Sequence, residues 1–301
     1  MKMATKIKSI WMLLRPYQWI KNFFVVAPLL FSVEFIHLNQ CLRSFAAFVC
    51  FCLASSTVYI FNDLLDVKED RNHPQKCNRP IASREITFPQ AWVCILLLLA
   101  VAILLCLLLG TNFLILVFSY VLLGAVYSLF FKHMPILDVM VLSAFFLIRI
   151  FAGCVILDIT ISSWMILCTI MLALFLGFSK RKAELMSAND TGLSRKVLEE
   201  YSQPFLDHII TLLAGSTIIC YALYTVDQYT VEKFGTQNLV FTIPFVLYGI
   251  FRYLYLVYHL HKGQEPSKLM VTDKGIFFSV LLWAICSGII LLFAKEINSF
   301  F

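Results

Sequence analysis

The sequence predicts an all-α, polytopic membrane protein with about nine transmembrane helices. Of its 301 residues, 60% are hydrophobic and 14% are charged, whereas a soluble domain carries about a quarter charged residues. The mean hydropathy is +0.85. Nine segments approach the roughly 20 apolar residues that cross about 30 Å of hydrocarbon. Most of the Lys and Arg residues lie between these segments, on one side. Together these observations exclude a soluble globular fold.

The expected spans follow one another along the whole chain. They cover residues 19–37, 42–63, 91–109, 112–131, 138–157, 162–179, 205–226, 238–258 and 276–294. The first is the weakest, because Lys21 and Asn22 lie inside it and Pro28 interrupts it. We expect the amphipathic stretch 5–14 before it to lie along the membrane interface. No small-residue cleavage site follows the basic N-terminus, so we expect no removable signal peptide.

The distribution of basic residues predicts the orientation of these spans. Segments 1–22, 64–90, 131–137, 180–204 and 259–274 contain 19 Lys and Arg residues (5, 5, 1, 5 and 3, in chain order), and the opposite links contain 3. Because basic residues gather in cytoplasmic loops, we expect a cytoplasmic N-terminus. We further expect one transmembrane catalytic domain over residues 1–301, with active-site loops at about 64–90, 131–137, 180–204 and 259–274.

The ten cysteines do not indicate a metal or disulfide framework. Most of them lie inside apolar runs, where cysteine behaves as a small hydrophobic residue. No Cys/His spacing resembles a zinc site. The histidines likewise show no arrangement to which we can assign chemistry.

An acidic cluster at the inner end of the second span is the main candidate for chemistry. It contains Asn62, Asp63, Asp66 and Asp70, and at helical spacing these four side chains share about a quarter of the helix surface. Carboxylates held so closely repel one another unless a cation lies between them. Oxygen ligands with open positions suit Mg²⁺ that also binds a diphosphate. The alternative is a solvated acidic helix end paired with Lys68 and Arg71.

Arg79 and Pro80 follow in the next polar segment. Arg79 can bind a phosphate through two parallel hydrogen bonds, and Pro80 fixes the backbone after it. An Arg-Pro pair taken alone is more often only a turn.

The pattern Asn-Asp-x-x-Asp-x-x-x-Asp-Arg followed by Arg-Pro resembles the first signature of the UbiA superfamily of intramembrane prenyltransferases. The resemblance extends over nearly the whole chain in span number and loop placement. It implies a nine-helix bundle in which Mg²⁺ on aspartates binds a diphosphate substrate. It assigns Asp63, Asp66 and Asp70 as metal ligands, and Asn62, Asp66 and Asp70 as catalytic residues.

The second aspartate motif of that superfamily is missing here. The corresponding segment contains Lys180, Arg181, Lys182 and Glu184, ends near Tyr201, and has Asp190 as its one aspartate. A site that loses carboxylates and gains cations is suited to more negative charge. This departure argues against an allylic diphosphate with a neutral aromatic acceptor.

Several further stretches resemble one branch, the decaprenyl-phosphate phosphoribosyltransferases. They are Arg15–Asn22, Tyr127-Ser128 with Lys132, His133 and Asp138, Leu147–Arg149 with Ala152 and Gly153, Lys180–Leu185, and Arg252-Tyr253. The branch implies phosphoribosyl diphosphate (PRPP) as donor and a polyprenyl phosphate as acceptor. The substrate-binding candidates are Arg15, Lys21, Asn22, Arg71, Arg79, Tyr127, Lys132, Asp138, Arg149, Lys180, Arg181, Glu184 and Tyr201.

Each basic candidate also has a simpler interpretation. A lysine or arginine in an inside loop can serve membrane topology alone. Lys21 differs because it falls within an expected span and needs an anionic partner. Arg149 lies about 16 Å deep in its span at 1.5 Å per residue, and either contacts substrate or pairs with a carboxylate or carbonyl. Arg252 is close enough to the inner interface for its head to reach water.

The sequence therefore predicts Mg²⁺-dependent transfer of a 5-phosphoribosyl group from PRPP to a polyprenyl phosphate, releasing diphosphate. The resemblance implies a role in cell-envelope precursor synthesis at the bacterial inner membrane. The nearest alternative is prenyl transfer to an aromatic acceptor, and the next is a transporter without chemistry. We expect contacts with membrane lipids and no nucleic-acid partner. Homo-oligomerisation is left open.

Overall fold

The computed structural model describes residues 2–32, 34–74, 76–160, 162–191, 196–260, 263 and 265–294. Every secondary-structure element among them is helical, which confirms the predicted all-α class. Contacts divide the chain into two compact units. Unit 1 is Met1–Val141 with Ile148–Thr160, and unit 2 is Leu142–Leu147 with Ile161–Phe301. The expectation of a single catalytic domain over residues 1–301 stays a prediction.

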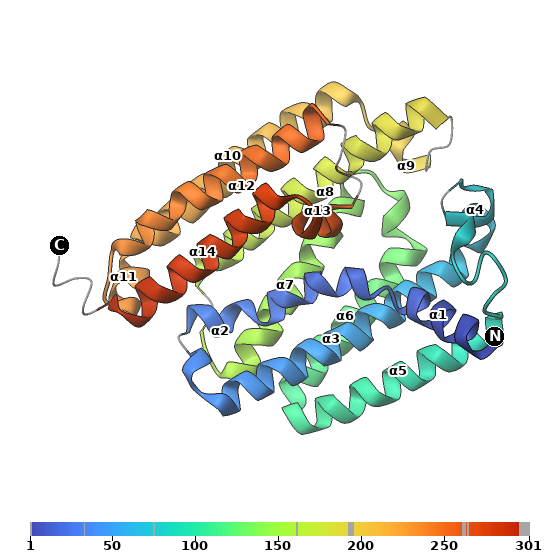
Figure 1. Ribbon diagram of the computed structural model, residues 1–301, viewed down its shortest axis with the longest axis horizontal. Helices are drawn as coiled ribbons and strands as arrows, with labels where there is room; N and C mark the ends of the chain where they lie inside the picture. Colours follow the sequence, from blue (N-terminus) through green and yellow to red (C-terminus); the bar gives the residue numbers. More distant parts are fainter. Residues whose placement is uncertain are drawn as a thin grey trace. The chain divides into compact units, whose positions relative to one another are not determined.

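Unit 1 is built around the long helix α3. Its elements are α1 (Lys2–Leu14), η1 (Pro16–Val25), α2 (Ala27–Phe31), η2 (Glu34–Ile36), α3 (Leu38–Leu65), α4 (Val67–Asn72), η3 (Lys76–Asn78), α5 (Phe88–Leu109), α6 (Thr111–Leu129), η4 (Phe131–His133) and most of α7 (Leu137–Leu157). Helices α5 and α6 pack along α3, and α1 and η1 also lie against it (Figure 1). The buried side of α3 therefore forms the centre of this unit.

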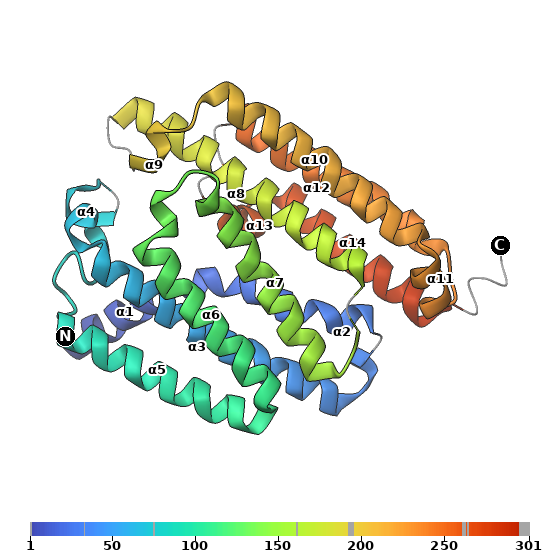
Figure 2. The same ribbon diagram turned by 180° about the vertical axis from the view of Figure 1, so that it is seen from behind.

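Unit 2 is a bundle of helices packed in pairs. Its elements are α8 (Ser163–Thr191), α9 (Lys196–Glu199), α10 (Gln203–Val226), α11 (Gln228–Phe234), η5 (Asn238–Thr242), α12 (Ile243–Tyr258), α13 (Pro266–Thr272) and α14 (Lys274–Leu292). The most extensive pairing joins α8 to α10, and α12 packs on α14 (Figure 2).

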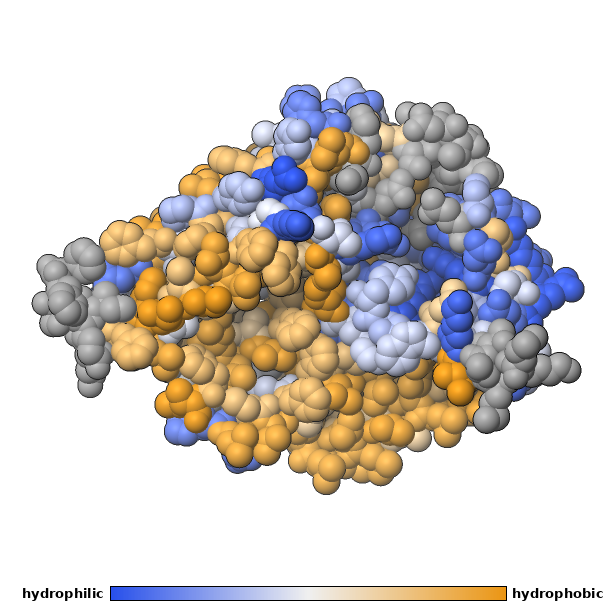
Figure 3. Space-filling view, viewed as in Figure 1, coloured by the Kyte–Doolittle hydropathy of each residue, from blue (hydrophilic) through white to orange (hydrophobic). Residues whose placement is uncertain are grey.

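Eight stretches of described helix are long and apolar enough to cross a membrane. They are Leu38–Leu65, Phe88–Leu109, Thr111–Leu129, Leu137–Leu157, Ser163–Met186, Gln203–Val226, Asn238–Tyr258 and Lys274–Leu292. On the face shown in Figure 3, apolar side chains cover α5 and α14, whereas hydrophilic residues gather around α4. An apolar outer surface is what a helix needs where the surrounding solvent is lipid.

The expected first span, 19–37, is the one that differs. It forms η1, α2 and η2 instead of one continuous helix. Pro28 is the second residue of α2, where proline is tolerated but cannot continue a preceding helix. Asn22 is fully buried within η1. A polar side chain held inside the protein and a chain break together explain why this segment is not a simple lipid-facing span.

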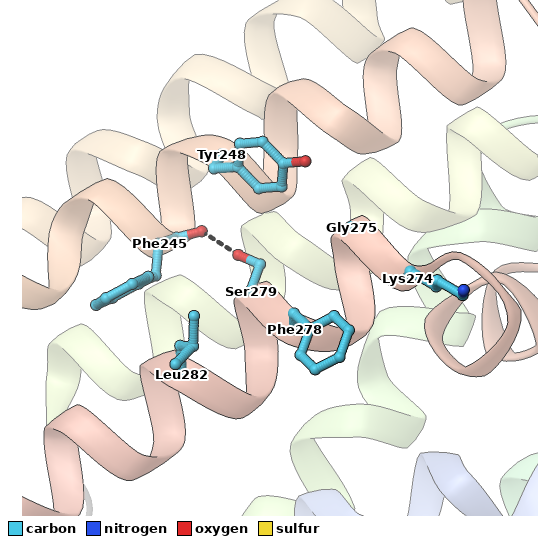
Figure 4. Close-up of a pocket in the computed structure, with 7 residues that line it drawn as sticks. All are labelled: Phe245, Tyr248, Lys274, Gly275, Phe278, Ser279 and Leu282. Carbon is cyan, nitrogen blue, oxygen red and sulfur yellow. Dashed lines mark hydrogen bonds between the residues drawn. The ribbon is translucent and has the colours of Figure 1, made fainter.

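A groove lies between α12 and α14 in unit 2 (Figure 4). Its volume is about 460 Å³, and Phe245, Tyr248, Phe278 and Leu282 form most of its apolar lining. The Ser279 hydroxyl donates to the Phe245 carbonyl oxygen at 2.5 Å beside it. This hydrogen bond links α12 to α14 at the groove.

The backbone of η1–α2 approaches α7 closely at Gly153. A Cβ atom built on Gly153 would lie 2.1 Å from the Val25 carbonyl oxygen and 2.9 Å from Pro28 Cγ. No side chain fits there without movement of the backbone. Gly153 thus allows the broken segment η1–α2 to pack against α7.

We expect Gly153→Ala to lower stability by about 1–3 kcal/mol, because overpacking forces the backbone apart. Gly215→Ala on α10 is the matched control, since a Cβ there meets nothing within 4 Å. Thermal unfolding in detergent should show a lower midpoint for the first variant and little change for the second. Equal midpoints would contradict this account of the packing.

Candidate active site

The acidic residues of the predicted cluster lie at the junction of α3 and α4. Asp63 is in the last turn of α3, Asp70 is in α4, and Asp66 stands between the two helices with φ −88° and ψ 7°. These angles fall in the sparsely populated bridge region of the backbone map. The expected single helical face is therefore broken at Asp66, although the Asp66 and Asp70 amides still donate to the carbonyls four residues earlier.

Asp63 and Asp70 are held together by an arginine. Arg79 Nη1 donates to Asp63 Oδ1 at 2.9 Å and to Asp70 Oδ2 at 2.7 Å. Asp63 Oδ1 also accepts from Arg15 Nη2 at 2.5 Å. Asp63 is 2% exposed and Asp70 is 3% exposed. Such buried carboxylates are stable only with compensating charge, which the two guanidinium groups supply.

Asp66 has a different pair of partners. Lys132, in the α6–α7 connection, forms an ion pair with Asp66 Oδ1. Asn62 Nδ2 donates to Asp66 Oδ2 at 2.8 Å. Seven predicted residues therefore form two contact groups at this helix junction, one of Arg15, Asp63, Asp70 and Arg79 and one of Asn62, Asp66 and Lys132. Together we refer to them as the cation–carboxylate cluster.

An unusual turn places Arg15 in this cluster. Arg15 has φ 53° and ψ 57°, a left-handed conformation that costs about 1–2 kcal/mol for a residue with a side chain. The Ser56 hydroxyl donates to the Leu14 carbonyl at 2.8 Å and accepts from Trp19 Nε1 at 3.1 Å. These contacts fix the chain on both sides of the turn. The Arg15 guanidinium also lies over the Tyr59 ring, 5.2 Å from its centroid.

The charge of Arg15 is stabilised where it lies. Burial acts to lower the pKa of the Arg15 guanidinium, but the negative charge of Asp63, with smaller contributions from Tyr17 and Tyr59, outweighs it. The pKa of Arg15 therefore stands above its ordinary value. Arg15 remains a cation at any pH at which the protein folds.

The cluster has donors of the kind that Mg²⁺ prefers. Carboxylate oxygens and the Asn62 amide oxygen are hard ligands, and Mg²⁺ typically uses one or two carboxylates together with substrate phosphates and water. Among the described residues, no group of three or more His, Cys, Asp or Glu side chains is arranged so that it could hold a metal ion. One or two of these carboxylates would suit a magnesium ion only together with phosphate oxygens and water.

A separate polar network lies inside unit 1. Arg149, 2% exposed, donates from Nε to Asn22 Oδ1 at 2.8 Å and from Nη2 to the Tyr120 hydroxyl at 2.6 Å. Asn22 Nδ2 donates in turn to Ser55 Oγ at 3.2 Å. Two predicted substrate-binding residues, Asn22 and Arg149, thus contact each other. The interpretation of Arg149 as a paired intramembrane residue gains support from these contacts.

The basic segment Lys180–Lys182 is helical, because α8 continues beyond its apolar run. Arg181 is 1% exposed and donates to Glu184 Oε2 at 2.6 Å. Lys180 lies 3.7 Å from the same carboxylate and is 34% exposed. Lys182 pairs with Asp207 at 2.5 Å. Of these three cations, Lys180 is the one with substantial exposure.

The remaining predicted residues lie in several different environments. Arg71 donates from Nε to the Ala82 carbonyl at 3.2 Å, which supports the loop that carries Arg79. Asp138 is fully buried in the first turn of α7. Tyr201 is buried against Phe178, with ring centroids 6.4 Å apart. Lys21 lies in η1 and Tyr127 lies in α6.

Sequence reasoning missed three residues that position these groups. Tyr59 lies one helical turn before Asp63, so its place beside the cluster follows from helical spacing. Ser56 is a serine within an apolar span, where a hydroxyl that bonds another segment is an informative signal. Tyr120 had no signal, because its contact with Arg149 joins residues that are 29 positions apart.

Comparisons with known proteins agree with this fold. The profile of the UbiA prenyltransferase family matches residues 23–282. The decaprenyl-phosphate phosphoribosyltransferase of Mycolicibacterium smegmatis is 33% identical over 287 residues, covering 89% of this chain and 88% of that protein. The protein of the same name from Corynebacterium glutamicum is 33% identical over 280 residues, covering 91% and 83%.

Two solved structures share the fold. A UbiA homolog from Archaeoglobus fulgidus, bound to GPP and Mg²⁺, superposes with a TM-score of 0.70 at 18% identity, covering 94% of this chain and 99% of that one. A structure of digeranylgeranylglyceryl phosphate synthase superposes with a TM-score of 0.66 at 20% identity, covering 95% and 99%. The predicted membrane-embedded helical fold is confirmed.

Proposed function

From the premise that this chain belongs to the UbiA prenyltransferase family, an integral membrane family, we propose that it transfers a 5-phosphoribosyl group from PRPP to a polyprenyl phosphate. The similarity to decaprenyl-phosphate phosphoribosyltransferases carries this proposal, because the sequence identity is 33% over about nine-tenths of the chain. The group that leaves the ribose is released as inorganic diphosphate. The ester formed links the anomeric carbon of the ribose to the lipid phosphate.

The charge balance of the cation–carboxylate cluster supports a diphosphate ligand. Three carboxylates face three cations there, so their formal charges cancel. A divalent cation alone would leave the positive charge of the metal unbalanced in this cluster. A diphosphate ester carries enough negative charge at neutral pH to offset the charge of the metal. The cluster therefore favours the metal and the diphosphate as a joint ligand.

In the proposed reaction, Asp63, Asp66 and Asp70, with Asn62 orienting, would hold Mg²⁺, which supplies charge neutralisation of the leaving diphosphate. Arg15, Arg79 and Lys132 would bind phosphate oxygens by charge-assisted hydrogen bonds. As the bond from the anomeric carbon to the diphosphate lengthens, positive charge develops on the ribose ring. The lipid phosphate attacks as a ready-made anion, so no residue needs to act as its base.

The basic segment Lys180–Lys182 favours PRPP over an allylic diphosphate as the substrate. It stands where the superfamily has a second aspartate motif, and Lys180 is exposed enough to reach a ligand. Prenyl transfer to an aromatic acceptor remains the alternative that the family name favours. We place the active site on the cytoplasmic side of the bacterial inner membrane, because the inside segments carry most of the basic residues.

The test is an assay with purified protein, labelled PRPP, polyprenyl phosphates of several lengths and Mg²⁺. We expect label in the lipid fraction, and none when an allylic diphosphate and 4-hydroxybenzoate replace these substrates. Asp66→Asn and Asp70→Asn should each reduce turnover below about a tenth of wild type while the protein still folds, because they remove metal-binding oxygens. Prenylation of the aromatic acid would support the alternative function.

We further expect Lys180→Ala to raise the KM for PRPP about tenfold, since a charge-assisted phosphate contact is lost. Lys180→Arg should not fully restore it, because a planar fork replaces a point charge. Lys182→Ala is the matched control, because Lys182 is 2% exposed and paired with Asp207, so its loss should affect stability rather than KM. The measurement is a PRPP titration at saturating lipid phosphate. A change below threefold for Lys180→Ala would mean that this segment serves only topology.

A further inference from the structure

Asp63 differs from the other two aspartates because one of its oxygen atoms accepts hydrogen bonds from two arginines. Asp63 Oδ1 accepts from Arg15 Nη2 at 2.5 Å and from Arg79 Nη1 at 2.9 Å. A carboxylate oxygen offers about two acceptor directions, so both are occupied by guanidinium groups. Asp63 is also 2% exposed. Its Oδ1 atom is therefore already fully engaged as an anchor for two cations.

A metal ion fits poorly on the same carboxylate. A dication on the other oxygen of Asp63 would stand beside two guanidinium ions inside a buried site, where screening by water is weak. Asp66 has a different environment, because its partners are one cation, Lys132, and the neutral Asn62 amide, so a metal there would meet one positive charge instead of two. Mg²⁺ needs only one or two carboxylates when phosphates complete its shell.

The backbone around Arg15 indicates what Asp63 holds in place. Arg15 keeps a left-handed conformation, which persists only where surrounding contacts over-determine it. Ser56 and Trp19 fix the neighbouring backbone, and Asp63 fixes the side chain. Arg79 is held between Asp63 and Asp70. The result is a pair of guanidinium groups that share one carboxylate, Asp63, and Asp70 adds a second contact to Arg79 alone.

We propose that Asp63 is a positioning residue and not a metal ligand. It orients Arg15 and Arg79 toward the diphosphate of the substrate, while Asp66, with Asn62, is left to hold the metal. The inference rests on the proposed Mg²⁺-dependent transfer and divides the roles within that site. It also changes the assignment suggested by the sequence, in which all three aspartates bind the metal.

The first test measures equilibrium binding to the purified full chain in detergent. Mn²⁺ serves as the spectroscopic substitute for Mg²⁺, and electron paramagnetic resonance counts free Mn²⁺. Asp66→Asn should weaken Mn²⁺ binding at least tenfold, whereas Asp63→Asn should change it less than threefold. Inorganic diphosphate, added as its Mn²⁺ complex, should bind about tenfold more weakly to Asp63→Asn. Equal loss of Mn²⁺ affinity in the two variants, or none in Asp66→Asn, would overturn the proposal.

A second variant covers the case in which Asp63→Asn unfolds because Arg15 loses its partner. In Asp63→Asn with Arg15→Gln, both charges of the pair are gone, so the thermal midpoint should return toward wild type. Diphosphate binding should remain weak in this double variant. Purely additive losses in the midpoint would mean that Asp63 does not act through Arg15, and would overturn the proposal.

These measurements separate the inference from the proposed function. Mn²⁺ and diphosphate binding are read without turnover and without a lipid acceptor. If no polyprenyl phosphate is ever labelled while Asp63→Asn keeps Mn²⁺ and loses diphosphate, the proposed transfer fails and the role of Asp63 stands. If transfer occurs and Asp63→Asn loses Mn²⁺ as Asp66→Asn does, the outcome is the reverse.

Discussion

Burial of carboxylates at the end of α3 is the constraint on which the rest of unit 1 depends. A charged oxygen inside the protein is tolerated only with an opposite charge and hydrogen bonds around it. Asp63 therefore requires the turn that carries Arg15, and also the loop that carries Arg79. Asp66 requires the connection that carries Lys132. Three segments far apart in the sequence converge because one helix end needs their cations.

This neutral arrangement has a consequence for how ligands bind. Arg79 and Lys132 occupy the aspartate oxygens that a metal would also use, so a metal must compete with the protein's own cations. In the proposed reaction, a diphosphate would shift that competition, because it would offer the displaced cations a new partner. Binding of the metal and binding of the diphosphate would then favour each other through charge.

Local features of the sequence were sufficient for the spans and for the acidic cluster. Hydropathy locates eight of the expected helices, because the physics of a lipid-facing helix is read residue by residue. Hydropathy did not predict the structure of the segment 19–37, because Asn22 there is buried by its hydrogen bond with Arg149, a residue 127 positions away. The burial of Arg181 was also beyond reach, because α8 extends past its apolar run. Long-range partners, and not local propensity, decide these positions.

The ion pairs of Arg181 and Lys182 show why membrane orientation alone does not explain the basic residues of this chain. A lysine that only orients a membrane protein has no reason to leave water, because the orientation rule counts charges and not contacts. Yet Arg181 and Lys182 are 1% and 2% exposed, and each is held by a carboxylate of its own unit. Their desolvation is a cost that a topological role would never impose. Lys180, on the same helix turn but 34% exposed, is consequently the cation in that segment whose charge is most available to a ligand.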